Sequence, residues 1–142
     1  MFERIVLAID ASEHSRQATQ VTAELAARLG AEVSVVHVFE VAPVPLAPGV
    51  RPVDVMPEAR ASAEKLVAEA VAELERAGVK ATGQVSDTAR STAAQIMDAA
   101  RTANAGLIVM GSRGLSDLHG LMVGSNTHKV IHLAHCPVLV VR

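Results

Sequence analysis

Short apolar runs rich in Val and Ile recur along the chain, separated by longer stretches with helical spacing. Four of these runs lie at 5–9, 33–39, 107–110 and 138–141, and a fifth, less apolar run covers 79–85. The first four do not alternate strictly between apolar and polar residues, which is typical of strands covered on both faces. The pattern therefore predicts five strands of a mainly parallel sheet.

Apolar residues spaced three and four positions apart predict four helices between these strands. The first begins after Ser12, a residue type favoured at helix N-caps, and ends at Gly30. The second keeps its apolar spacing over 63–77 and is followed by Gly78. The third is expected at 92–102 and the fourth at 125–134, with Ser125 as the N-cap of the fourth.

The alternation of strands and helices predicts an α/β fold, a three-layer sandwich with right-handed crossovers around a five-stranded, mainly parallel sheet. A length of 142 residues is that of a single domain, expected over 1–142. Proline density predicts a loop between the second strand and the second helix. Five of the six prolines fall there: Pro43, Pro45, Pro48, Pro52 and Pro57.

Composition narrows the choice of partners. Half of the residues are hydrophobic and 20% are charged, so the chain can bury a core. The net charge is −2, and Phe2 and Phe39 are the only aromatic residues among Phe, Tyr and Trp. A nucleic acid partner is not expected. The chain has no net positive charge to attract a phosphate backbone, and it lacks a set of aromatic side chains on which bases could stack.

The lone cysteine and the amino-terminal residues suggest a reducing compartment. Cys136 has no second cysteine with which to form an intramolecular disulfide, and packing is its expected role. The first residues lack the features of a secretory signal, and no apolar run is long enough to span a bilayer. We therefore expect a cytoplasmic protein without membrane association.

Glycines cluster after the fourth predicted strand and before the fourth predicted helix. The first group is Gly111-Ser112-Arg113-Gly114, and Gly124-Ser125 follows. Ligands of open α/β sheets bind beyond the carboxyl ends of strands, and glycines allow the backbone to approach an anion closely. A helix N-terminus favours phosphate, and Arg113 could add a charge-assisted contact. A plain turn followed by a helix cap explains the spacing equally well.

The segment is neither a Walker loop nor a dinucleotide fingerprint, because Gly-Lys-Ser/Thr and Gly-x-Gly-x-x-Gly are both absent. Its pattern, Gly111-x2-Gly114-x9-Gly124-Ser125, instead resembles the ATP-binding pattern of the universal stress protein family. The flanks at 107–114 and 136–142, the first strand through Asp10 and Ser12, and residues 35–38 are also similar to that family. The resemblance covers essentially the whole chain and implies a Rossmann-like fold of the adenine nucleotide alpha hydrolase-like kind.

The resemblance also implies which residues contact ATP. Ile9 and Asp10 would meet the nucleoside, Val38 would border adenine, and Met110 and Gly111 would line the ribose and base. The phosphates would be met by Gly114, Gly124, Ser125 and Asn126, with Arg113 beside them and Mg2+ or Mn2+ bridging the phosphate oxygens. Asp10 has an alternative role, in which it bonds the amides of the first helix. After the third strand, Ser86-Asp87-Thr88-Ala89-Arg90 replaces the shorter turn common in the family.

Histidines are the other candidate ligands. The spacing of His128, His132 and His135 places them on one flank of the last helix, with Thr127, Val130, Ile131 and Ala134 on its core face. Lys129 stands where a zinc protease motif needs glutamate, so a solvated or dimer-facing flank is expected rather than a metal site. His37 is expected to be a hydrogen-bonded core residue.

These features favour a binding protein over an enzyme. No Gly-x-Ser-x-Gly elbow and no dedicated base beside the glycines is apparent, so no catalytic residue is predicted. We expect an ATP-dependent sensor or regulator of stress adaptation, read by an unidentified protein partner. A slow ATP hydrolase or phosphoryl transferase, a cyclic-AMP-binding relative and a ligand-free relative are the alternatives.

The last strand, at 138–141, is expected at an edge of the sheet, where an apolar unpaired strand promotes association. Pairing with its copy in a second chain would cover that edge. The family resemblance likewise implies a homodimer through the C-terminal strand.

Overall fold

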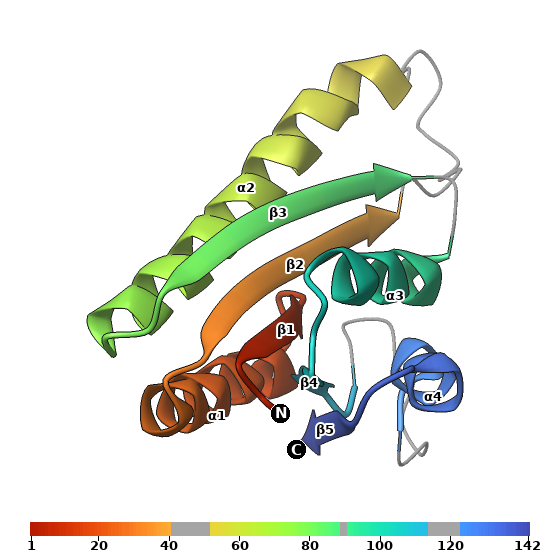
Figure 1. Ribbon diagram of the computed structural model, residues 1–142. Coiled ribbons are helices and arrows are strands. Elements are labelled where there is room, and N and C mark those ends of the chain that lie inside the picture. Colours follow the sequence, from red (N-terminus) through yellow and green to blue (C-terminus); the bar gives the residue numbers. More distant parts are fainter. Residues whose placement is uncertain (41–51, 89–90, 114–122) are drawn as a thin grey trace.

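The computed structural model describes residues 1–40, 52–88, 91–113 and 123–142. Five strands within these ranges form a single sheet (Figure 1). Its strands are β1 (Arg4–Ile9), β2 (Glu32–Glu40), β3 (Ala81–Thr88), β4 (Leu107–Gly111) and β5 (Val138–Val141). They lie in the order β3-β2-β1-β4-β5, and each neighbouring pair is parallel. The predicted α/β class and five-stranded sheet are confirmed, and β5 lies at an edge as expected.

The direction in which strands are added reverses between β1 and β4. From β1 the chain adds β2 and then β3 on one side, and it later adds β4 and β5 on the other. The loops that leave β1 and β4 therefore diverge, which opens a crevice at the carboxyl ends of the strands. Asp10, which directly follows β1, lines that crevice.

Four helices connect the strands within the described ranges: α1 (Glu13–Leu29), α2 (Pro52–Arg76), α3 (Thr92–Thr102) and α4 (Ser125–Leu133). Ser12 is the N-cap of α1 as predicted, and its hydroxyl accepts a hydrogen bond from the Ser15 amide at 3.2 Å. Gly30 ends that helix with a φ of 64°, a left-handed conformation that glycine adopts without strain. Ser91 caps α3 in the same way as Ser12 caps α1.

The helices cover both faces of the sheet, as Figure 1 shows, and so create two apolar clusters. On one face, α1 and α2 pack over a cluster that includes Leu7 and Leu74. On the other, α3 and α4 pack over a cluster that includes Val6, Ile96 and Val130. Side chains from successive positions of β1 enter opposite clusters, so this strand is buried on both faces, as its continuous apolar run predicts.

The single cysteine belongs to the second cluster. Cys136 is half-buried and packs against this cluster as a free thiol, which agrees with the expected packing role. Its partial burial raises the pKa of the thiol, because the thiolate would lose solvation there. Among the described helices, none combines the length and apolar character needed to cross a bilayer.

The prediction of a proline-rich loop extends too far toward the carboxyl terminus. Helix α2 begins at Pro52 and continues through Pro57, although Pro57 has no amide for a helical hydrogen bond. Proline is well suited to a first helical position because its φ is already helical. The packing of a 25-residue helix on β2 and β3 stabilises it against the single missing bond at Pro57. Pro43, Pro45 and Pro48 lie outside the described residues.

The third strand begins and ends at later residues than the sequence predicts. It covers Ala81–Thr88 rather than 79–85, and the residues expected to form a turn, Ser86 to Thr88, pair in parallel with Val38 to Glu40 of β2. The length of β2 provides partners for these polar residues, which apolar patterning cannot reveal. Ala89 and Arg90 lie outside the described residues.

The last helix also differs from its prediction. Gly124, not Ser125, is the N-cap of α4, and the helix ends at Leu133 before Ala134 and His135. Thr127 and Val130 are buried as expected, whereas Ile131 is 46% exposed and does not belong to the core face. The chain leaves the helix at Ala134 in an extended conformation to reach β5.

Candidate functional site

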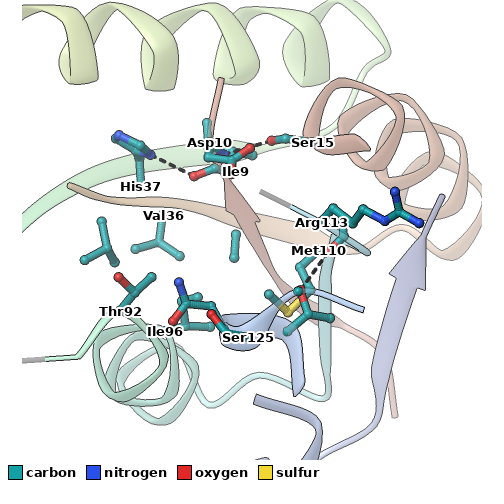
Figure 2. Close-up of a pocket in the computed structure, with 16 residues that line it drawn as sticks. Ile9, Asp10, Ser15, Val36, His37, Thr92, Ile96, Met110, Arg113 and Ser125 are labelled. Atoms are coloured by element: carbon teal, nitrogen blue, oxygen red, sulfur yellow. Dashed lines mark hydrogen bonds between the residues drawn. The ribbon is translucent and has the colours of Figure 1, made fainter. Parts of the chain in front are cut away.

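A cleft of about 300 Å³ occupies the crevice at the carboxyl ends of β1, β2 and β4 (Figure 2). The first turns of α3 and α4 form its opposite wall. Its lining residues are Ala8, Ile9, Asp10, Ser15, Val36, His37, Val38, Thr92, Ile96, Met110, Gly111, Arg113, Gly124, Ser125, Asn126 and Thr127. Of the ten residues predicted for the site, nine are in this set, and Gly114 lies outside the described residues.

Gly111 is required by the packing of α1 as well as by its place in the cleft. A Cβ built on Gly111 would lie 2.9 Å from the backbone carbonyl carbon of His14 and 2.9 Å from its Cβ. Real Cβ atoms do not approach a backbone this closely, so a side chain here would push α1 away from β4. The conformational freedom that the sequence suggested is therefore not the main reason for this glycine.

Hydrogen bonds fix both described ends of the glycine-containing loop. The Thr127 hydroxyl donates to the Gly111 carbonyl at 3.0 Å, and the Gly124 amide donates to the Ser112 carbonyl at 2.8 Å. The Ser112 amide in turn donates to the carbonyl of Val141 in β5 at 2.6 Å. The start of α4 is thus held against the end of β4, with Gly111 and Gly124 at one end of the cleft.

The first turn of α4 carries no side-chain cap. Gly124 has φ −66° and ψ 154°, and as a glycine it offers no oxygen to the amides that follow. Ser125 and Asn126, the first two helical residues, line the cleft. The amides of a helix's first turn have no partners within the helix, so this end presents donors and a partial positive charge. Such an arrangement is suited to an anion.

Asp10 is held in place by the beginning of α1. Its Oδ1 accepts a hydrogen bond from the Ser12 amide at 2.9 Å. Its own amide donates to the Ser15 hydroxyl at 2.9 Å (Figure 2). The predicted alternative, in which Asp10 bonds an amide at the first helix, is therefore present. A carboxylate accepts about four hydrogen bonds, so Asp10 keeps capacity for hydroxyl donors in the cleft.

Apolar side chains make up the wall between Asp10 and α3. Val36, Ile96 and Met110 are buried beside the half-buried Val38, and all four line the cleft. They come from β2, α3 and β4, so the wall depends on the sheet and the α3 face together. A flat aromatic or heteroaromatic ring would find a dry surface here.

His37 is half-buried at the margin of the cleft rather than in the core. Its Nδ1 lies 2.7 Å from the Ile9 carbonyl oxygen and donates to it (Figure 2). The hydrogen bond agrees with the prediction for His37, whereas the core position does not. Because β1 and β2 pair in register at Ile9 and His37, this contact joins neighbouring strands where both approach the cleft.

Arg113 points away from the middle of the cleft. Its side chain is exposed, and in Figure 2 the guanidinium extends away from Met110 and Ser125. Its backbone carbonyl accepts a hydrogen bond from the Ser12 hydroxyl at 3.3 Å, which holds the loop against the α1 N-terminus. A contact between the guanidinium and an anion at α4 would require a rotation of the side chain.

Ser15, His37, Thr92 and Thr127 also line the cleft, although the sequence did not indicate them as site residues. Ser15 and Thr127 lie one turn or less into their helices, so helical spacing alone could have placed them near the same edge. His37 depends on the pairing register of β2, and Thr92 depends on α3 crossing beside β2. Neither relation is visible in a single sequence.

The described part of the cleft is better equipped to bind than to form a metal centre by itself. Its ionisable lining residues are Asp10, His37 and Arg113. Within the described ranges, no three His, Cys, Asp or Glu side chains gather in a metal-binding arrangement. The site therefore combines an apolar wall, one fixed carboxylate and an anion-attracting helix end.

Comparisons with known proteins agree with this architecture. The model of the Universal stress protein family matches residues 1–142. The chain is 40% identical to a universal stress protein of Thermus aquaticus over 144 aligned positions, which cover 100% of both chains. It is 36% identical to the universal stress protein YxiE of Bacillus subtilis, again with 100% of both chains covered.

Solved structures of the family share the fold. A protein of the universal stress protein family from Burkholderia pseudomallei aligns with a TM-score of 0.80 at 26% identity, covering 99% of this chain and 96% of that one. A universal stress protein from Archaeoglobus fulgidus in complex with dAMP aligns with a TM-score of 0.73 at 22% identity, covering 100% and 98%. Another universal stress protein, in complex with cAMP, gives 0.74 at 20% identity, with 99% and 97% covered.

Proposed function

The chain belongs to the universal stress protein family, and from this premise we propose that it binds ATP and acts as a nucleotide-dependent regulator in stress adaptation. The observation that carries the proposal is the division of the cleft into two ends. One side has the uncapped first turn of α4 with Ser125, and the opposite side has the fixed carboxylate of Asp10, with apolar side chains lining the space between them (Figure 2). A nucleotide has the same division between phosphates and nucleoside.

The phosphates would lie at the α4 end. Amides of Ser125, Asn126 and Thr127 are the donors in the first helical turn, and the short, ordered contact between Gly124 and Ser112 keeps them in place. Donors that are already oriented need not lose freedom when the anion arrives, which favours binding. Gly114 and the Arg113 guanidinium would add to this end.

The nucleoside would lie between Asp10 and the apolar wall. Asp10 would accept hydrogen bonds from ribose hydroxyls, and Ile9, Val38, Met110 and Gly111 would surround the ribose and base. The dAMP and cAMP complexes of two related proteins support an adenine nucleotide as the class of ligand. They favour adenine recognition in the family without distinguishing ATP from a monophosphate for this chain.

A divalent cation, Mg2+ or Mn2+, would accompany ATP. The described residues at the α4 end offer hydroxyl, amide and guanidinium groups, whereas the lining carboxylate, Asp10, lies at the nucleoside end. The cation would therefore be held by phosphate oxygens and water, and would supply charge neutralisation of the phosphates. The protein's own part is to fix those phosphates through the amides of α4.

The same geometry favours a regulator over a fast hydrolase. Phosphoryl transfer needs a residue that positions the attacking nucleophile beside the phosphates. Among described lining residues, His37 and Asp10 are the candidate bases, and both are bonded to backbone groups at the opposite end. ATP occupancy would instead alter the loop between β4 and α4, which a protein partner would detect.

A proline substitution tests the phosphate position directly. Ser125 is the first residue of α4, where proline preserves helix geometry but removes the amide, and the extended ψ of Gly124 is compatible with a following proline. We expect Ser125→Pro to weaken ATP binding by about tenfold, because one charge-assisted hydrogen bond is lost. Adenosine binding should change little. Isothermal titration calorimetry with both ligands measures the difference.

Ser125→Ala is the matched control, since it removes the hydroxyl and keeps the amide. It should retain most of the ATP affinity. Nucleotide released by denaturing freshly purified protein, identified by chromatography, shows which ligand the chain carries from the cell. Equal ATP affinity for Ser125→Pro and wild type would disprove the phosphate position, and an absence of ATP binding in wild type would disprove the proposed function.

A further inference from the structure

Two histidines on α4 lie together on the surface, outside the cleft. His128 and His132 are separated by one helical turn and are both exposed. Their Nε2 atoms are 3.3 Å apart, and their ring centroids are 4.5 Å apart. Val130, between them in sequence, is fully buried, so the helix is anchored through its opposite face while both imidazoles face solvent.

The distance between the two nitrogens matches the requirement of a shared tetrahedral metal ion. Zn2+ binds imidazole nitrogen at about 2.0–2.1 Å, so two nitrogens at the tetrahedral angle lie about 3.3–3.4 Å apart. Coordination at a right angle would bring them to about 2.9 Å with the same bond lengths. We propose that His128 and His132 form a Zn2+ site on the surface of α4, with both Nε2 atoms as ligands.

The spacing of these residues in sequence did not establish such a site. Histidines four positions apart share a helix face in any helix, and either ring could have pointed elsewhere. In the folded chain, each ring turns its Nε2 toward the other ring, so the same nitrogen of both histidines lies on the facing side. Without a metal, the two nitrogens share a hydrogen bond, in which one imidazole donates and the other accepts.

The site is open and separate from the proposed nucleotide site. No third His, Cys, Asp or Glu joins the pair among the residues that the structure describes, so water would complete the coordination. Neither histidine lines the cleft, which separates this Zn2+ from a cation held by ATP phosphates. His135 lies beyond the end of α4 and is not part of the site.

Titration of the full, nucleotide-free chain with Zn2+ alone tests the proposal. Calorimetry should give one Zn2+ per chain, and NMR spectra should show shifts of two of the six histidine side chains. His128→Asn and His132→Asn should each reduce the affinity by about tenfold or more, because a two-point attachment becomes a single one. His135→Asn, an exposed histidine nearby, should bind Zn2+ as wild type does.

Circular dichroism provides the folding control, and because all three side chains are exposed, the three variants should keep the wild-type spectrum. The proposal is overturned if wild type shows no Zn2+ binding or if the His128→Asn/His132→Asn double variant keeps wild-type affinity. It is also overturned if His135→Asn loses as much affinity as His128→Asn. ATP affinity measured without Zn2+ should be the same in all of these variants, so the result does not depend on the proposed function.

Discussion

At the residue scale, Gly111 and Gly124 belong to the same sequence pattern, but the physical need for glycine differs between the two positions. Gly111 faces the backbone of His14 at a distance that no side chain can occupy. Gly124 has backbone angles that alanine adopts readily. The pattern of glycines indicated the edge of the sheet at which the cleft lies, yet the reason for each glycine depends on which helix approaches it.

Gly111→Ala should therefore reduce stability much more than Gly124→Ala. The added methyl at residue 111 must displace backbone atoms of α1, and overpacking of this kind costs about 1–3 kcal/mol. At residue 124 the expected loss is smaller, a few tenths to about 1 kcal/mol, since alanine is only a poorer N-cap. Urea unfolding measures both values, and equal losses would contradict the explanation.

Several site residues could be predicted because the signal is local. Asp10 and Met110 end apolar runs, and a parallel sheet brings such ends to one edge. His37 and Thr92 could not be predicted, because their places depend on the register of β2 against β1 and on how α3 crosses the sheet. The N-cap of α4 was misassigned for a similar reason, since the bond from Gly124 to Ser112 determines where the helix begins.

At the scale of elements, the contact between α2 and β3 explains an error of the sequence prediction. β3 is an edge strand with few apolar residues. Its polar positions Thr82, Gln84 and Ser86 interrupt the apolar pattern from which a strand is predicted. Gly83 lets α2 lie close, because a Cβ there would be 2.3 Å from Cγ1 of Val67. Long-range packing, rather than apolar content, sets the limits of this strand. The buried strands β1 and β4 were predicted well because their apolar runs are continuous.

Gly83→Ala should destabilise the protein by about 1–3 kcal/mol, because Val67 is 6% exposed and β-branched and has little freedom to move. Val67→Ala alone removes buried methyl groups and should also destabilise. In the double variant the closest contact, with Cγ1 of Val67, is gone and the tight contact with Cγ2 of Val71 at 3.0 Å remains, so the combined loss should be smaller than the sum. Thermal and urea unfolding of all four proteins measure this coupling, and simple additivity would contradict the proposed clash.

At the scale of the whole molecule, the two edges of the sheet differ in how they are covered. β3 carries α2 along its length, whereas β5 is four residues long, half-buried and apolar throughout. An apolar edge strand of this kind favours pairing with another strand. The homodimer predicted from the sequence, formed by β5 of two chains, would cover it.

Val140→Lys should weaken this association, because lysine at an edge strand opposes pairing. Light scattering should then report a mass near the 14.8 kDa of one chain, compared with about twice that value for wild type. An unchanged melting temperature at low protein concentration would show that the variant is folded. If wild type is itself a single chain in solution, or if the variant keeps the wild-type mass, pairing through β5 is wrong.

The hydrogen bond from the Ser112 amide to the Val141 carbonyl joins the last strand to the loop that precedes α4. Ser112 also accepts the bond from Gly124, so only two hydrogen bonds separate β5 from the first turn of α4. A molecule that pairs with β5 and shifts it would move the α4 amides without entering the cleft. Thermodynamic linkage then requires reciprocity: the factor by which such pairing changes ligand affinity equals the factor by which the ligand changes pairing.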